Sequence, residues 1–238
     1  MKKMLQTLKY LYKGYALLIA IGFLSILGSA AITDLIYYLT SGYFKNSPAP
    51  QTVRITVPMD AAAAVCALLI GLILFLVNFK VALANGISRR TFLLANFPAA
   101  GITAAVFSIF NLAVVQVHGL FWPVILISQL FYPQIGWAGL LILQFALYFL
   151  LIVAGWIITL AYYRSSNPVK WAISLAPFIL YGLLKAADAG SGGMIFQVIN
   201  DYQHISMRME IAPFTLLAYS AILCGLVYLL LRRAPLKD

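Results

Sequence analysis

The residues that could do chemistry are few in this chain and lie far apart. The two histidines, His118 and His204, belong to no HExxH metal-binding pattern. The two cysteines, Cys66 and Cys224, each lie inside an apolar run with neither a CxxC spacing nor a histidine partner. They are interpreted as small buried hydrophobic residues. A GxSxG nucleophile motif is also absent. These residue types and spacings predict neither a metal site nor a catalytic nucleophile.

The carboxylates and the missing phosphate-binding motif support the same interpretation. No pair of carboxylates lies at mid-membrane depth, where a proton relay or an ion-coupling site would need it. Asp34 and Asp60 lie near the ends of apolar runs and are interpreted as charges at the membrane interface. The GxxxxGK[ST] pattern that cradles the phosphates of ATP is absent. The chain is therefore predicted not to be an enzyme and to bind no cofactor itself, so energy-driven work would need a separate protein.

One short polar stretch, residues 85–91, interrupts two long apolar runs. It consists of Asn85, Gly86, Ile87, Ser88, Arg89, Arg90 and Thr91. Its Asn-Gly pair readily accepts a positive φ, and Ser88 could cap a helix that begins at Arg89. The two arginines offer planar, bidentate donors that another protein could bind. The alternative is that the arginines only anchor helices at the membrane and that Asn-Gly only forms a turn.

The composition of the whole chain explains why this polar stretch stands out. Of the 238 residues, 63% are hydrophobic and 9% are charged, and the mean hydropathy is +0.97. Soluble domains carry about 25% charged residues, so this chain could not cover a surface that faces water. The formal net charge of +10 lies almost wholly at the ends of apolar runs. It forms no basic face, which argues against nucleic acid as a partner.

The apolar runs predict an all-α polytopic membrane protein with a single transmembrane domain over residues 1–238. A helix needs about 20 apolar residues to cross the bilayer, and six runs approach or exceed this length. The predicted spans are about 14–38, 60–84, 91–117, 138–162, 171–187 and 212–231. The fifth is only marginally long enough, so its boundaries are left open.

Four segments at or between these spans need separate interpretation. Residues 1–13 predict a short interfacial helix, with a frayed basic start as the alternative. Residues 53–57 alternate apolar and polar side chains and allow a short strand. Residues 118–137 predict an interfacial or re-entrant segment on the outer side. The first apolar run exceeds the roughly 7–15 residues of a signal peptide, so it is expected to be retained, with cleavage within residues 1–31 left open.

The distribution of cations orients the predicted helices. With the N-terminus inside, twelve Lys and Arg residues lie on the cytoplasmic side and four lie outside, in short loops where the positive-inside rule is most reliable. The inner cations are Lys2, Lys3, Lys9, Lys13, Lys80, Arg89, Arg90, Arg164, Lys170, Arg232, Arg233 and Lys237, and the outer ones are Lys45, Arg54, Lys185 and Arg208. The outer acids are Asp34, Asp60, Asp188, Asp201 and Glu210. This predicts cytoplasmic termini and a cytoplasmic 85–91 stretch.

This layout resembles the permease subunit of a type-2 ABC transporter of the small bacterial exporter kind. In that family a basic interfacial helix precedes six spans, and both termini are cytoplasmic. Residues 85–92, Asn-Gly-Ile-Ser-Arg-Arg-Thr-Phe, are similar to the N-G-x-S-R-(K/R)-x-x sequence found between spans two and three in many Gram-positive members. The topological resemblance covers the whole chain, whereas the residue-level resemblance covers these eight positions.

The resemblance implies a function and partners. The chain would be a multi-pass protein of the bacterial cytoplasmic membrane, and residues 85–91 would be the coupling turn that contacts a separate ATPase. ATP and Mg²⁺ would bind on that partner subunit. Two permease chains, identical or different, would pair with two ATPases to export peptides, antibiotics, lipids or polysaccharides. The chain departs from the family pattern in its apolar 118–137 segment and its short fifth span.

Two other classes of protein are compatible with the same sequence. One is a non-catalytic membrane binding or sensory module, such as an accessory subunit or an immunity protein that sequesters a peptide. The other is a secondary transporter with an unrecognised site. Co-purification with a P-loop ATPase distinguishes the ABC permease from both.

Overall fold

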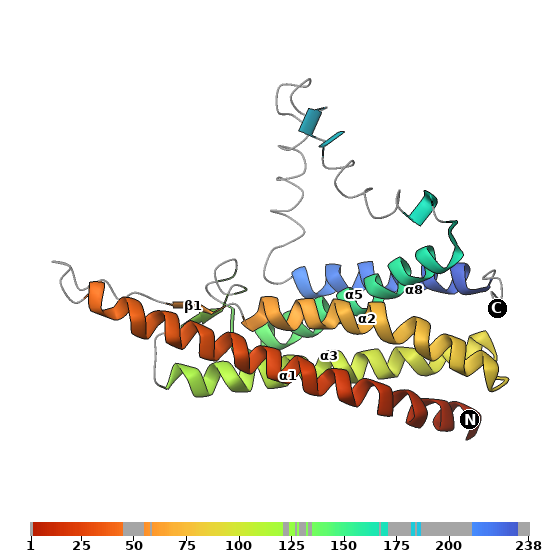
Figure 1. The fold of residues 1–238 in the computed structure, drawn as a ribbon, viewed down its shortest axis with the longest axis horizontal. Helices are drawn as coiled ribbons and strands as arrows, with labels where there is room; N and C mark the ends of the chain where they lie inside the picture. The colour runs from red at the N-terminus through yellow and green to blue at the C-terminus, as the bar shows by residue number, and fades with distance from the viewer. Residues whose placement is uncertain are drawn as a thin grey trace.

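The structure is a computed structural model of the full chain, and it describes residues 2–44, 55–57, 59–120, 124–126, 128, 132, 135–166, 168–170, 182–183, 185–186 and 211–232. Within these ranges five helices are long and apolar enough to cross a membrane. They are α1 (Lys2–Phe44), α2 (Met59–Ala84), α3 (Arg89–Gly119), α5 (Trp137–Arg164) and α8 (Ala212–Arg232). The prediction of a helical polytopic membrane protein is confirmed in this form (Figure 1).

The five helices match five of the six predicted spans to within a few residues at most of their ends. The predicted fifth span, 171–187, lies almost wholly outside the described residues. The start of the chain differs from the expectation, because α1 runs without a break from Lys2 to Phe44 and residues 1–13 do not form a helix of their own. Gly14 lies where the interfacial helix was expected to end. A single glycine costs a helix only about 1 kcal/mol, so the helix continues through it. The apolar part of α1 is Tyr15–Ile36.

Contacts at the two ends of the bundle fix the directions of the helices. The Tyr15 hydroxyl donates a hydrogen bond to Oδ1 of Asn96 at 3.0 Å, and Asp34 pairs with His118 at 2.9 Å. These contacts join early residues of α1 to early residues of α3, and late residues to late ones. The two helices therefore run in the same direction. Helix α2 runs oppositely, and the 85–88 turn joins its end to the start of α3.

Helices α5 and α8 both finish at the end of the bundle that carries the 85–88 turn, which we call the turn end. The ring of Tyr163, near the end of α5, lies 6.2 Å from that of Phe79 near the end of α2. The last carbonyls of α8 accept hydrogen bonds from Arg89 at the start of α3. Figure 1 shows the start of α1 and the end of α8 at this same end.

Close contact between α2 and α5 forms the centre of the bundle. Gly71 and Gly155 face each other there, so the two backbones meet without intervening side chains. The Thr159 hydroxyl donates to the backbone carbonyl of Leu72 at 2.8 Å, which links the same two helices. Small residues and interhelical hydrogen bonds are the features that hold helices together in lipid, where apolar burial gives no preference for protein over bilayer.

Aromatic rings fill the space between α2, α3 and α5. The ring of Phe75 lies 5.2 Å from that of Trp156 and 5.4 Å from that of Phe92, and the ring of Phe97 lies 5.7 Å from that of Trp156. Tilted and edge-on pairs of this kind are the favoured arrangements of aromatic side chains. The outward faces of the helices remain apolar, as a lipid-facing surface requires, with Leu24 and Phe214 each 69% exposed.

The opposite end of the bundle, which we call the strand end, carries two short strands. β1 (Ile55–Val57) pairs in parallel with β2 (Val124–Leu126), with Ile55 opposite Val124. The strand expected within residues 53–57 is therefore confirmed over 55–57. Strand β2 belongs to the 118–137 segment, so part of that segment lies beside β1, which precedes α2 in the chain.

Candidate functional site

The 85–88 turn begins with a well-formed helix C-terminus. Gly86 has a φ of +69°, in the left-handed region where a side chain is strained. Its N–H donates to the carbonyl of Leu83 at 2.9 Å, and the N–H of Ile87 donates to the carbonyl of Ala82 at 2.9 Å. These two bonds make the Schellman arrangement, which satisfies carbonyls that a helix end leaves unpaired. The positive φ expected of the Asn-Gly pair is confirmed at the glycine.

The next helix, α3, begins at Arg89, three residues after Gly86. Ser88 has extended backbone angles, and its Oγ accepts a hydrogen bond from the N–H of Thr91 at 3.2 Å. The Ser88 carbonyl also accepts from the N–H of Phe92 at 2.9 Å, which is the first bond of the helix. The predicted cap at Ser88 and helix start at Arg89 are both confirmed. The turn is therefore short and hydrogen-bonded along its length, so it can transmit a displacement to α2 and α3 together.

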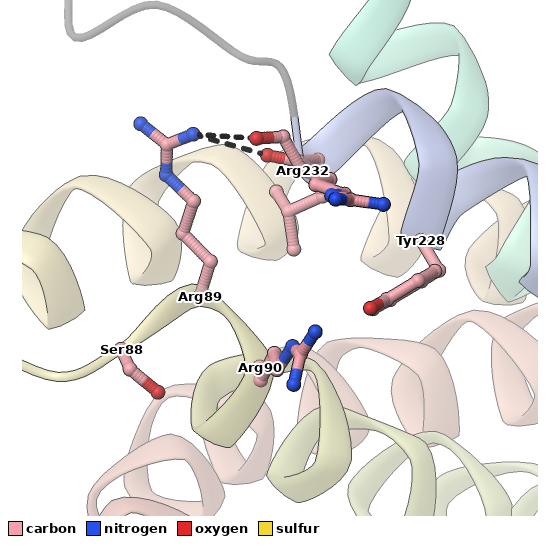
Figure 2. Close-up of a pocket in the computed structure, with 6 residues that line it drawn as sticks. Ser88, Arg89, Arg90, Tyr228 and Arg232 are labelled. Carbon is pink, nitrogen blue, oxygen red and sulfur yellow. Dashed lines mark hydrogen bonds between the residues drawn. The ribbon is translucent and has the colours of Figure 1, made fainter.

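Arg89 and Arg90 are adjacent in sequence but have different surroundings. The Nη1 of Arg89 donates to the backbone carbonyl of Arg232 at 3.0 Å and, more weakly, to that of Leu231 at 3.4 Å. These are among the last carbonyls of α8, where a cation is favoured by the helix dipole. Arg90 is exposed and makes no such bond to α8 within the described part of the chain. Figure 2 shows Arg89 extended toward the end of α8, whereas the guanidinium of Arg90 lies on the side of Tyr228.

Replacing Arg89 with a neutral residue is expected to destabilise the last turn of α8. The Arg89→Gln variant would lose a charged donor to two helix-terminal carbonyls, a contribution of about 1–2 kcal/mol at a partly buried site. Hydrogen–deuterium exchange of the amides in 226–232 is expected to become about tenfold faster than in the unmodified protein. The matched variant Arg90→Gln removes the same charge one residue away and should leave that exchange unchanged. Equal exchange in both variants would contradict the bracing role of Arg89.

A shallow hollow of about 280 Å³ lies beside this contact, between the start of α3 and the end of α8. It is lined by Ser88, Arg89, Arg90, Tyr228, Leu231 and Arg232. Figure 2 shows the guanidinium of Arg90 and the hydroxyl of Tyr228 facing each other across it. Three of the seven predicted contact residues, Ser88, Arg89 and Arg90, therefore lie together at one hollow. Asn85 and Gly86 are exposed at the tip of the turn instead, and Ile87 packs against the apolar core.

The structure also shows functional candidates that sequence reasoning missed. Asp34 pairs with His118, and the two residues lie 84 positions apart, so no local pattern could have joined them. Asp60 was expected at the membrane interface, but its side chain is buried and its Oδ2 accepts a hydrogen bond from the N–H of Ser128 at 2.8 Å. The physical reason is that Ser128, a described residue of the 118–137 segment, lies at the start of α2 and provides this donor.

Three buried polar side chains in the strand-end half of the bundle retain unsatisfied atoms. Asn111 on α3 donates to the Tyr148 hydroxyl on α5 at 3.3 Å, but its Oδ1 has no partner among the described residues. Both amide atoms of Gln144 and Oδ1 of Asp60 are likewise unpaired there. Within the described ranges no group of three or more His, Cys, Asp or Glu side chains could hold a metal ion.

Comparison with known proteins gives no match for this chain. No protein-family model, no curated protein and no solved structure matches the chain. The geometry of the turn end must therefore support a functional assignment by itself.

Proposed function

We propose that this chain is the membrane-spanning permease subunit of an ATP-driven exporter of the type-2 ABC kind, in a bacterial cytoplasmic membrane. The observation that carries the proposal is the 85–88 turn: two helices that are long enough to span the membrane are joined by four residues whose backbone is held by hydrogen bonds, with an exposed tip. A membrane protein that is moved by a cytosolic motor needs such a rigid, accessible connection. A passive loop would not need this rigidity.

The packing at the turn end supports a transmitting role. The turn is continuous with α2 and α3, and Arg89 connects the start of α3 to the end of α8. α2 is in turn in backbone contact with α5 through Gly71 and Gly155. A push on the tip would thus reach four helices as a group, because packed helices move as rigid elements with little internal deformation.

The proposal assigns the remaining roles to other subunits. ATP and Mg²⁺ bind on a separate ATPase, and this chain is not an enzyme. A second permease chain, identical or different, completes the path through the bilayer, and both termini and the turn face the cytoplasm. The contact with the ATPase is made by residues 85–91. The exposed Asn85 and Gly86 form its tip, and Arg89 holds α8 in place.

The test is a bulky substitution at the tip of the turn. Asn85→Trp places a large side chain at an exposed position without burying anything in the bundle. We expect an ATPase encoded beside this chain to co-purify with the unmodified protein and to be reduced at least tenfold with the variant, because a mispositioned contact of this size excludes close docking. Quantification of both subunits after affinity purification in detergent measures this.

The matched control adds the same side chain at the other end of the bundle. Leu120 is 80% exposed at the end of α3, so Leu120→Trp is expected to leave co-purification unchanged. If no P-loop ATPase accompanies the unmodified protein, the permease assignment is wrong. If one does and Asn85→Trp retains it, the motor acts elsewhere on the chain.

A membrane subunit that binds a polar solute is a second candidate, and one observation favours it. The unsatisfied atoms of Asp60, Asn111 and Gln144 lie in the strand-end half of the bundle, and buried polar groups without partners are costly unless something binds there. This would suit a secondary transporter or a sensory module. Absence of an ATPase, together with solute-dependent protection of α3 and α5 in hydrogen exchange, would favour this candidate.

A further inference from the structure

The hollow at the turn end has a composition that the coupling role does not require. Three of its six lining residues are arginines, Arg89, Arg90 and Arg232, and they come from two helices whose sequence positions are far apart. Arg89 uses its guanidinium on the α8 carbonyls, whereas Arg90 and Arg232 are exposed. Tyr228 adds a hydroxyl on the facing wall. The hollow thus presents two exposed guanidinium groups and a phenol to one small space.

No carboxylate among the described residues balances these charges. The ion pair that the described part of the chain contains, Asp34 with His118, lies at the strand end. Like charges that gather around one space repel each other, and an anion placed between them reverses that cost. Guanidinium groups and a hydroxyl match the oxygens of a phosphate, which arginine binds with bidentate geometry.

The apolar surroundings of the hollow indicate where the phosphate comes from. Leu94 lies one turn beyond Arg90 on α3 and is 58% exposed, and Leu229 lies one turn before Arg232 on α8 and is 59% exposed. Both leucines lie closer to the middle of the membrane than the arginines do. An exposed apolar surface that runs into lipid-facing helix faces suits acyl chains. α3 and α8 meet at this end through the Arg89 bonds, and the hollow lies beside that contact.

We propose that this hollow binds the phosphate headgroup of an anionic phospholipid in the leaflet at the turn end, with its acyl chains along Leu94 and Leu229. The lipid would bridge the start of α3 and the end of α8 beside the Arg89 contact. The volume of about 280 Å³ lies just below the usual range of ligand-site sizes, about 300–1,000 Å³, and suits a headgroup better than a folded peptide. The lipid would share Ser88, Arg89 and Arg90 with the proposed ATPase contact, but its binding can be measured on this chain without an ATPase.

The experiment is a lipid titration of the purified full chain in neutral detergent, followed by native mass spectrometry. The probes are phosphatidylglycerol, phosphatidylcholine with the same acyl chains, and inorganic phosphate. We expect one phosphatidylglycerol to bind per chain at least tenfold more tightly than phosphatidylcholine. Since each cation near an anionic headgroup changes affinity about fivefold, Arg90→Gln should weaken phosphatidylglycerol binding about fivefold and Arg90→Gln with Arg232→Gln more than tenfold.

The matched control removes the same net charge outside the hollow. Lys80 lies near the end of α2 and Lys170 lies six residues after the end of α5, and neither lines the hollow. Lys80→Gln with Lys170→Gln should change phosphatidylglycerol affinity less than twofold. Thermal unfolding of every variant checks that it is folded, and Arg90→Gln alone, at an exposed helix start, serves if the double variant unfolds.

Four results would overturn the lipid proposal. Equal binding of the two lipids, or equal losses in the two double variants, would show only general charge attraction. Displacement of phosphatidylglycerol by an equal concentration of inorganic phosphate would show a simple anion site. Unchanged lipid binding in Arg90→Gln with Arg232→Gln, combined with loss of a co-purifying ATPase, would assign these arginines to a protein partner. None of the lipid readouts depends on the permease assignment, so either proposal can fail without the other.

Discussion

The Gly71→Ala variant is expected to lose about 3 kcal/mol of its free energy of unfolding, although it adds a single carbon. A Cβ at Gly71 would press against the backbone carbonyl of Ile152 on α5, and a Cβ at Gly155 would lie 2.8 Å from backbone atoms of Leu68, Gly71 and Leu72 on α2. A side chain in the way could rotate aside, but a backbone cannot. The two helices must separate, and overpacking of this kind costs about 1–3 kcal/mol, with the upper end expected here.

Two other glycines in spanning helices provide the control. A Cβ at Gly101 on α3 or at Gly225 on α8 would have nothing within 4 Å. Gly101→Ala and Gly225→Ala should therefore leave stability unchanged or raise it by up to about 1 kcal/mol through helix propensity. Unfolding in mixed detergent, followed by far-ultraviolet circular dichroism, measures all three variants. A Gly71→Ala protein as stable as Gly101→Ala would show that α2 and α5 do not meet closely.

This contact illustrates what sequence could not reveal. α2 and α5 are apolar around their whole circumference, as membrane helices are, so no hydrophobic stripe indicates which face lies inward. Gly71 and Gly155 carry no local signal that they face each other across 84 positions. The places of the five spans, by contrast, followed from apolar runs alone, because only a helix satisfies its backbone within lipid. Helix α1 is the exception in length, since it extends beyond the predicted 14–38 at both ends.

The candidate site likewise has one part that the sequence predicts and one part that it does not. The backbone of the 85–88 turn was predictable, since Asn-Gly and Ser88 act on groups within a few residues of themselves. The role of Arg89 was not, because its acceptors Leu231 and Arg232 lie more than 140 positions away. The sequence presents both arginines as donors to another protein, or as membrane anchors. In the structure one bonds to α8 and the other is exposed at the hollow.

The Gly86→Val variant is expected to lose both stability and the proposed partner. Gly86 has a φ of +69°, and a β-branched residue in the left-handed region costs about 1–2 kcal/mol or leaves that region. If residue 86 left the left-handed region, the bonds from Gly86 to Leu83 and from Ile87 to Ala82 would break. The tip of the turn would then adopt several conformations. We expect co-purification of the ATPase to fall at least tenfold, with unfolding in detergent measured in parallel.

Gly86→Asn separates the shape of the turn from the loss of a glycine. A Cβ at this position meets nothing within 4 Å, and asparagine tolerates the left-handed region far better than valine does. This variant should therefore keep the turn, most of the stability and the partner. If Gly86→Val is destabilised yet still retains the ATPase, the turn is a structural connection and the motor binds another surface. If both variants lose the ATPase at unchanged stability, the partner contacts the glycine backbone directly, which would place the contact at the tip itself, away from the arginines.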